Sequence, residues 1–440
     1  MTSEERREAR YRRRVAGRAA KKAEKCTEYD DFEKVFSYEH LYRSYRMCRR
    51  NVAWKASVQK YITQAPLMVN QAYERLHNGK FRSSGFYEFD LNERGKIRHI
   101  KSVTISERVV QRCLCDYALV PMLERTFIYD NAASLKCKGY HFAIRRCCQH
   151  LREHYHKHGN EGYILLFDFK KFFDRVSHEV CKDILRREFT DERIIALTEH
   201  FIDCFGDIGL GLGSQISQTF ALASANRLDH YIKEVCGIRG YGRYMDDGYL
   251  IHESKEYLQK CLEGIRRICE ELEITLNEKK THIVKISHGF TFLQARIYLT
   301  DIGKVLRKIP HKSVTRERRK LKKFVPLVES GVMTYNDVYT SFQSWRAYAR
   351  NFSAYRTITS MGELFDRLFI EPWIFRGGYS RPADLNTIQD IRKHPFEGAF
   401  LVRKTKERRN AMGLQPVYDG YAIGNKMWSP YDYSSGYGGT

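Results

Sequence analysis

The sequence predicts an α+β fold in which short antiparallel strands are set among many helices. Two hairpin patterns and one strand-length apolar run support this prediction. Residues 81–102 and 240–252 each carry strand-like arms on either side of a turn, and Tyr163–Asp168 is apolar until its last residue. The segments between them carry apolar residues at helical spacing. Hairpins set among helical segments are typical of the α+β class.

The other segments follow in chain order. Residues 1–26 contain ten lysines and arginines against four glutamates, and form either a solvated helix or frayed arm, or an arm that binds an RNA backbone. Helical patterns occupy 32–80, 105–124, 140–158, 178–204, 255–272 and 311–370, and a glycine-rich turn and helix together cover 206–235. Further strands are expected at 281–286 and 289–299. The tail from residue 371 is rich in Gly, Tyr, Pro and Ser.

The composition indicates a folded, basic chain that binds a polyanion. Of the 440 residues, 42% are hydrophobic, which is enough for a core, and the formal net charge is +23. A nucleic acid is the first candidate partner and an anionic membrane surface the second. No apolar run approaches the roughly 18 residues of a membrane span, and the charged N-terminus does not resemble a signal peptide. We therefore expect a cytoplasmic protein without a membrane partner.

Three carboxylates carry the chemistry that the sequence predicts. Asp246 and Asp247 lie at the turn of the second hairpin, where paired acids are costly unless a cation neutralises them. The alternative is that Asp247 and Gly248 form only an ordinary hairpin turn. The run Tyr163–Asp168 ends in a third acid, which is poorly suited to a core and well suited to a site. If the two strands are neighbours, Asp168 and Asp246 come together and can hold two Mg²⁺ ions for attack of a hydroxyl on a phosphorus.

These acidic segments resemble the catalytic motifs of reverse transcriptases. Tyr244-Met245-Asp246-Asp247 matches the aromatic-x-Asp-Asp box, and LLFDFKKFFDRVSH (165–178) matches the palm motif with the first catalytic aspartate. Five further segments resemble family motifs in the family's order: ERGKIRHI (93–100) in the fingers hairpin, ISERVVQR (105–112) and SLKCKGYHFAIRR (134–146) in the next fingers motifs, LNEKKTHI (276–283) with the palm lysine, and FTFLQARIYL (290–299) in the primer-grip hairpin. The resemblance covers about residues 80–300.

The resemblance implies an α+β right-hand polymerase fold, with fingers, an antiparallel palm sheet backed by helices, and a helical thumb. The expected divisions are a basic N-terminal arm and helical region at 1–79, fingers and palm at 80–300, a thumb at 301–370, and an extension of unknown role at 371–440. It also implies an enzyme, an RNA-directed DNA polymerase. Such an enzyme would use template RNA, an RNA/DNA primer-template, deoxynucleotides and two Mg²⁺ ions, for which Mn²⁺ can substitute.

Metal-binding and catalytic roles follow at the matching positions. The metal ligands would be three carboxylates and one backbone carbonyl: Asp168, Asp246, Asp247 and Phe169. Lys280 would stand near the leaving pyrophosphate and donate a proton, with the neighbouring Lys279 as a rival that the pattern does not separate from it.

Nucleotide-binding roles follow in the same way. Arg98, with Lys96 or Lys101 nearby, would bind the incoming triphosphate. Phe173, five residues after Asp168, falls where the family keeps a bulky ring against the sugar, which excludes a 2′-hydroxyl and favours deoxynucleotides. The alternative is that the Phe173 ring only packs in the core.

One motif departs from the usual pattern of the family. Most reverse transcriptases carry Gln-Gly-x-x-x-Ser-Pro, whereas this chain has LGSQISQ at 212–218. Leu212 replaces a glutamine that would contact the nucleotide, Gly213 is retained, and Gln218 replaces the proline. This form resembles reverse transcriptases of diversity-generating retroelements, which copy an RNA with errors at adenines and work with a small accessory protein. Losing one hydrogen bond at the nascent base pair weakens discrimination by about 1 kcal/mol.

Two other functions stay open at this point. An antiphage-defence reverse transcriptase, which makes cDNA or repetitive DNA from an associated non-coding RNA, shares these motifs and often carries extensions such as 371–440. A non-catalytic RNA-binding scaffold on a polymerase fold is the alternative of another class, although the intact set of acids speaks against it. The sequence is also compatible with a homo-oligomer.

The expected thumb is strongly basic. We expect its basic run to contact the template–primer backbone, through Arg316, Arg318, Arg319, Lys320, Lys322 and Lys323. The helical spacing of four aromatic residues favours a place in the thumb core over a stacking surface for bases: Trp345, Tyr348, Phe352 and Tyr355.

Overall fold

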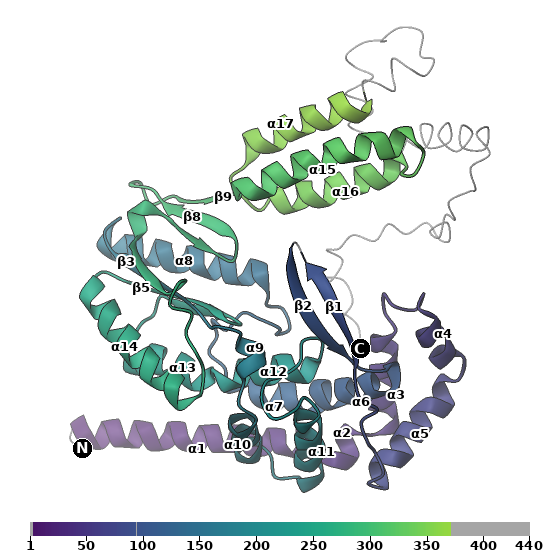
Figure 1. Ribbon diagram of the computed structural model, residues 1–440. Coiled ribbons are helices and arrows are strands. Elements are labelled where there is room, and N and C mark those ends of the chain that lie inside the picture. The colour runs from purple at the N-terminus through teal and green to yellow at the C-terminus, as the bar shows by residue number, and fades with distance from the viewer. Residues whose placement is uncertain (1–2, 94, 371–440) are drawn as a thin grey trace, which may run out of the picture. The chain divides into compact units, whose positions relative to one another are not determined.

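The computed structural model of this chain describes residues 3–93 and 95–370. The chain divides into two compact units, Met1–Arg307 and Lys308–Thr440 (Figure 1). The larger unit contains the predicted hairpins and the helices between them, and the described part of the smaller unit is mainly helical. The 371–440 extension lies outside the described residues.

The helices of the larger unit fall close to where the apolar spacing predicts them. They are α1 (Ser3–Tyr29), α2 (Phe32–Val35), α3 (Tyr38–Cys48), α4 (Ala56–Thr63), α5 (Ala65–His77), α6 (Ile105–Leu114), α7 (Val120–Glu124), α8 (Tyr140–His158), α9 (Phe172–Arg175), α10 (His178–Glu188), α11 (Glu192–Asp203), α12 (Gln215–Ser224), α13 (Asn226–His230) and α14 (Lys255–Glu271). Short π-helical segments, Cys115–Leu119 and Tyr231–Val235, continue α6 and α13. No helix within residues 3–93 and 95–370 has the length and apolar character needed to cross a membrane.

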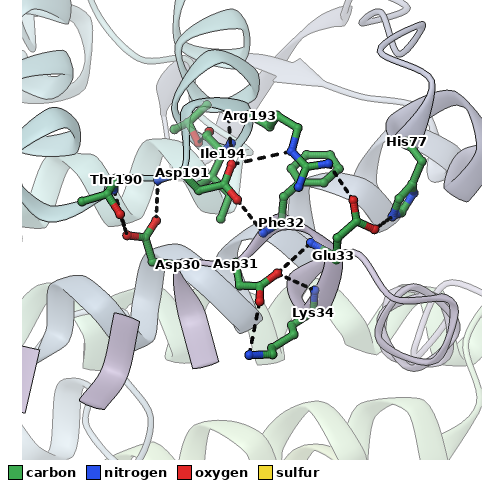
Figure 2. A network of polar contacts seen from close by, with 11 residues as sticks. Asp30, Asp31, Phe32, Glu33, Lys34, His77, Thr190, Asp191, Arg193 and Ile194 are labelled. Carbon is green, nitrogen blue, oxygen red and sulfur yellow. Dashed lines mark hydrogen bonds and ion pairs between the residues drawn. The ribbon is translucent and has the colours of Figure 1, made fainter. Parts of the chain in front are cut away.

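Two aspartates fasten the N-terminal helices to α10 and α11 (Figure 2). Asp30, which follows α1, is buried and accepts hydrogen bonds from the backbone and the hydroxyl of Thr190 (2.8 Å each) and from the backbone of Asp191 (3.1 Å). Asp191 caps α11 by accepting from the backbone of Arg193 (2.9 Å), and it also accepts from the backbone of Phe32 (2.8 Å). Such acceptors satisfy backbone donors that a helix terminus leaves open. The basic lead is therefore a helix that these contacts hold at its C-terminal end, while most of its described side chains are exposed.

A four-stranded antiparallel sheet, in the order β4–β5–β3–β6, lies within the larger unit. Its strands are β3 (Tyr163–Asp168), β4 (Tyr241–Tyr244), β5 (Asp247–His252) and β6 (His282–Lys285). Successive side chains point to opposite faces. Leu165, Phe167 and Leu250 enter the main core with residues of α12, α13 and α14, while Tyr249 reaches His150 of α8 at 2.9 Å. Helices thus back both faces of the sheet (Figure 1).

The fingers hairpin expected at 81–102 consists of β1 (Tyr87–Glu93) and β2 (Lys96–Ser102). The strands pair in register from Tyr87 with Ser102 to Glu93 with Lys96. The side chain of Asn92 accepts a hydrogen bond from the backbone of Gly95 at 3.0 Å and so closes the turn. Gly95 has φ +84°, a conformation that favours glycine.

The run 289–299 is a hairpin, so the single strand that its pattern predicts is wrong. β7 (Phe290–Phe292) pairs with β8 (Ala295–Leu299), which pairs with β9 (Val305–Lys308). Leu293 and Gln294 form the turn with φ +45° and +64°, values that apolar spacing does not reveal. The hairpin form agrees with the resemblance to a primer grip.

The described part of the smaller unit packs three helices, α15 (His311–Glu329), α16 (Tyr335–Ala349) and α17 (Tyr355–Phe365), and ends in a π-helical segment, Asp366–Ile370. Leu321, Phe342, Trp345 and Phe365 share its core. The rings of Phe342 and Phe365 stack with centroids 4.6 Å apart. These contacts join all three helices through their apolar faces.

The expected aromatic series of this core is correct for three residues and wrong for the fourth. Trp345 and Phe352 are buried and Tyr348 is half-buried, whereas Tyr355 is 83% exposed. α16 ends at Ala349 and α17 begins at Tyr355. Helical spacing does not continue across this break, so Tyr355 leaves the apolar face.

The fold prediction is confirmed at the level of architecture. The chain has an antiparallel sheet with a carboxylate hairpin, and helices cover both faces of that sheet. A helical segment follows in the sequence, and together these features form a right-hand polymerase fold of the α+β class.

Candidate active site

The carboxylate site forms where β3 ends and β5 begins. Asp168 is the last residue of β3, and its register partner is Asp247, the first residue of β5. Asp246 lies in the preceding turn, where its backbone carbonyl accepts a hydrogen bond from the N–H of Phe169 at 3.2 Å. The structure thus brings together the three acids and Phe169. The residue opposite Asp168 is Asp247 and not Asp246, because Asp246 belongs to the turn itself.

The backbone of the turn has an unusual conformation. Met245 has φ +57°, in the left-handed region that non-glycine residues seldom occupy. Its carbonyl accepts a hydrogen bond from the guanidinium of Arg243 at 2.8 Å. A side chain therefore holds the turn that presents Asp246 and Asp247.

The electrostatics of the site reflect the crowding of its acids. Burial, and then the charges of Asp246 and Asp168, raise the pKa of Asp247 to about 7, while Lys280 opposes this shift. Asp168 is itself only 5% exposed. Close, partly desolvated carboxylates repel one another unless a proton or a cation compensates their charge. The site therefore suits a positively charged ligand.

Two residues of the loop before β6 hold Asp168. The side-chain amide of Asn277 donates to Asp168 Oδ1 at 2.9 Å, and Lys280 Nζ pairs with Oδ2 at 2.6 Å. Burial lowers the pKa of Lys280, but the hydrogen bond and charge of Asp168 outweigh it and raise that pKa above its ordinary value. β6 begins only at His282, so strand alternation does not apply to Lys279 and Lys280. Both lysines are exposed, and the contact with Asp168 is what identifies Lys280 as the lysine of the carboxylate site.

The donor set fits a divalent ion that prefers oxygen ligands. Three carboxylates and the carbonyl of Phe169 are hard donors, and Mg²⁺ bound by a few protein oxygens commonly keeps water or phosphate oxygens as its other ligands. Within residues 3–93 and 95–370, no three His, Cys, Asp or Glu side chains form a preassembled metal site. Both oxygens of Asp168 accept hydrogen bonds instead, and the Lys280 ammonium supplies the positive charge.

Backbone contacts connect this site to the fingers hairpin. Phe173 lies on α9 and is half-buried against the core, with its ring centroid 6.1 Å from that of Phe172. Its carbonyl accepts a hydrogen bond from the N–H of Leu210 at 2.7 Å, and the carbonyl of Leu212 accepts one from Lys101 of β2 at 3.0 Å. The segments expected to hold the nucleotide are thus contiguous from β3 through α9 to β2.

The remaining residues that are expected to bind the nucleotide lie on or beside these segments. Gly213 has φ +116°, and a Cβ there would lie 3.1 Å from the carbonyl of Lys101, so the close approach to β2 favours glycine. Arg98 is half-buried on β2, and Gln218 is exposed on α12. The side chain of Lys96 lies outside the described residues.

The basic run lies on α15 in the smaller unit. Five of its six members are exposed: Arg316, Arg318, Arg319, Lys322 and Lys323. Lys320 is half-buried and pairs with Glu317 at 2.8 Å. Five cations on one helix form a surface that suits a polyanion.

Sequence reasoning missed two residues of the site, Asn277 and Arg243. Asn277 lies inside the LNEKKTHI segment, two residues before Lys279, and this closeness to the lysines is the signal in the sequence that points to it. Arg243 directly precedes the aromatic-x-Asp-Asp box. Nothing in the sequence indicates that its side chain is buried or which residues it contacts. Asn277 contacts the carboxylate of Asp168, and Arg243 contacts the carbonyl of Met245 in the turn before Asp246.

The sheet and the carboxylate hairpin have the arrangement of a right-hand polymerase fold. Residues 90–297 match the family model described as reverse transcriptase (RNA-dependent DNA polymerase). The match covers a little under half of the chain, and this segment is similar to the domain of enzymes of the RNA-directed DNA polymerase class. Domains of this family use an RNA template, nucleotide substrates and divalent metal ions.

Two individual proteins are similar to parts of the chain. Protein YkfC of Escherichia coli (strain K12) is 25% identical over 246 residues, which cover 46% of this chain and 64% of YkfC. A structure of apo telomerase from Candida tropicalis, truncated from its C-terminal domain, aligns with a TM-score of 0.40 and 14% identity. That alignment covers 51% of this chain and 55% of the telomerase chain.

Proposed function

We propose that this chain copies an RNA template into cDNA by adding deoxynucleotides to a primer hydroxyl, with two Mg²⁺ ions, which Mn²⁺ can replace. The observation that carries this proposal is the register of Asp168 with Asp247, beside the Asp246 turn, within a reverse transcriptase domain. Acids in this arrangement suit nucleotidyl transfer, in which metal ions stabilise the attacking and leaving oxygens.

Each residue of the site has a stated task in this reaction. Asp168, Asp246, Asp247 and the Phe169 carbonyl hold the metal ions, and Arg98 with Lys96 holds the triphosphate. Lys280, protonated beside Asp168, donates a proton to the departing pyrophosphate. For this step Lys280 must exchange its ion pair with Asp168 for the substrate. The exposed end of its side chain supports such an exchange.

Divalent-ion binding is expected to tighten as the pH rises toward and through 7. The raised pKa of Asp247, about 7, means that below this pH the folded protein keeps a proton that an ion must displace. Affinity should therefore rise by up to about tenfold per pH unit below pH 7 and level off above it. Titration of Mn²⁺ by electron paramagnetic resonance at several pH values measures this. Affinity that does not change with pH would show that Asp247 is not a ligand.

We further propose that synthesis is error-prone, as in diversity-generating retroelements. The support is Leu212, whose apolar side chain cannot donate or accept a hydrogen bond at the nascent base pair. Its carbonyl accepts a hydrogen bond from the N–H of Lys101, so Leu212 lies among the connected segments, from β3 through α9 to β2, that are expected to hold the nucleotide. Gln218, on the exposed side of α12, is the second departure from the usual motif.

Leu212→Gln is expected to lower the error rate opposite templating adenines by about fivefold. A restored hydrogen bond at the nascent pair adds about 1 kcal/mol of discrimination. The measurement is deep sequencing of the cDNA that the full chain makes on the RNA flanking its gene, beside Asp246→Asn, which gives the background. An error rate that Leu212→Gln leaves unchanged would contradict the role of this position.

The product also separates the other functions. Faithful cDNA, simple repeats or a homopolymer would favour an antiphage-defence reverse transcriptase acting on an associated non-coding RNA. Biological activity that survives in Asp246→Asn would favour a non-catalytic RNA-binding scaffold.

The basic face of α15 is proposed to bind the template–primer backbone. A small accessory protein and a homo-oligomer are further proposed partners, and a cytoplasmic location is proposed with them.

A further inference from the structure

Arg243 is the largest fully buried side chain among the described residues, and it lies two residues before Met245. A buried guanidinium is costly unless its charge is paired and its donors are satisfied. All the partners that meet this need lie on elements that frame the candidate active site.

The guanidinium of Arg243 joins three parts of the palm. It forms a two-point pair with Asp229 of α13, with Nε to Oδ1 at 2.7 Å and Nη2 to Oδ2 at 2.6 Å. Nη2 also donates to the carbonyl of Leu222 on α12 at 3.0 Å, and Nη1 donates to the carbonyl of Met245 at 2.8 Å. The hydroxyl of Tyr241 donates to Asp229 Oδ1 at 2.5 Å. The Asp229 carboxylate therefore orients the guanidinium, and the guanidinium orients the turn.

The backbone of Arg243 is fixed as well. Its N–H donates to the carbonyl of Asp130 at 3.2 Å, and its carbonyl accepts from the N–H of Ala132 at 3.0 Å. On its other side the residue pairs with Gly248 of β5. These contacts fix the backbone of Arg243. The length and direction of its side chain therefore determine where the Met245 carbonyl can lie.

We propose that Arg243, oriented by Asp229, is a positioning residue for the metal-binding turn. By fixing the Met245 carbonyl it sets where Asp246 and Asp247 stand relative to α12, the helix that follows the Leu212–Gly213 nucleotide motif. The role assigned to Arg243 rests on the proposed function of the carboxylates. Neither Arg243 nor Asp229 touches the reacting atoms.

Stability alone does not account for this pair. A buried ion pair is often no more stabilising than well-packed apolar side chains of similar volume, because both charges lose their hydration. Only the planar fork of arginine satisfies a carboxylate at two points and still donates to two carbonyls. Lysine has the same charge without that geometry. A positioning role therefore predicts that apolar replacement preserves the fold and impairs the site.

The test compares the double variant Asp229→Leu/Arg243→Met with wild type in the full chain. Arg243→Lys is a second variant. Arg125→Met/Glu188→Leu is the control, because it removes another ion pair in which a half-buried arginine, directly after α7, meets the buried Glu188 of α10. Thermal unfolding reports the fold, Mn²⁺ titration by electron paramagnetic resonance reports the carboxylates, and primer extension reports the reaction. Asp246→Asn shows which part of the Mn²⁺ signal belongs to this site.

The double variant is expected to unfold as wild type does, to bind Mn²⁺ several-fold more weakly, and to extend primers about 100-fold more slowly. The control should bind Mn²⁺ and extend primers normally. A folded double variant with wild-type Mn²⁺ affinity and extension rate would overturn the proposal. If the double variant does not fold, the same measurements are made on Arg243→Lys, and wild-type Mn²⁺ affinity and extension rate in that variant would likewise overturn the proposal. If wild type makes no DNA, the proposed function fails, whereas the Mn²⁺ comparison still tests Arg243.

Discussion

Asp246→Asn is expected to reduce DNA synthesis by about 1000-fold or more without unfolding the protein. The substitution removes one of the charges that hold the metal ions, and about 4 kcal/mol of lost transition-state stabilisation corresponds to this factor. Asparagine has nearly the same size as aspartate, so the turn keeps its backbone contact from Phe169. The pKa of Asp247 should fall toward its ordinary range, because the charge of Asp246 is one of the causes that raise it.

The measurement pairs primer extension on an RNA template with thermal unfolding in the absence of divalent ions. Loss of one repelling charge should leave the unfolding temperature unchanged or raise it, so activity and stability should separate. Asp183→Asn, which removes an exposed carboxylate from α10, is the matched control and should remain active. Extension by Asp246→Asn within tenfold of wild type would exclude the proposed role of this acid.

Phe173→Val is expected to lower the preference for deoxynucleotides over ribonucleotides by about 100-fold. The proposed gate works by occupying the space that a 2′-hydroxyl needs, and steric differences of this size correspond to a few kcal/mol at most. The half-buried position of Phe173 on α9, five residues after Asp168, is consistent with one edge of the ring facing a substrate. Valine shortens the side chain and opens that space.

The measurement is kcat/KM for a deoxynucleotide and for the matching ribonucleotide on one template. Phe172→Val is the control, because Phe172 is buried in the core beside Phe173 and its loss affects stability without opening the sugar site. A Phe173→Val variant that slows both nucleotides equally would assign Phe173 to packing alone, which is the alternative reading of this residue.

Much of the fold follows from local patterns in the sequence. The strand Tyr163–Asp168 has the bounds that its apolar run predicts, and the helix expected at 140–158 is α8. The helical spacing fails where a break interrupts it, as at Tyr355, and the strand pattern fails where the chain turns, as at Leu293. Both failures have one cause, since periodicity describes an element but not its ends.

The contacts of the site were harder to predict because they join distant segments. Asp168 and Asp247 are separated along the chain by several helices, and only strand pairing sets their register. The choice between Lys279 and Lys280 depends on a loop that directs one ammonium to Asp168. The amide of Asn277 and the guanidinium of Arg243 belong to the same class of contact.

The sequence by itself determined the order of the elements, the identity of the three acids and the reverse transcriptase motifs around them. Each of these is written locally, in side-chain spacing and in short runs of residues. The tertiary structure alone decided which acid faces Asp168, which lysine reaches it, and that a buried arginine holds the turn. The physical reason is that these contacts arise from the packing of elements far apart in the chain, where burial makes an unpaired charge costly and so selects its partner.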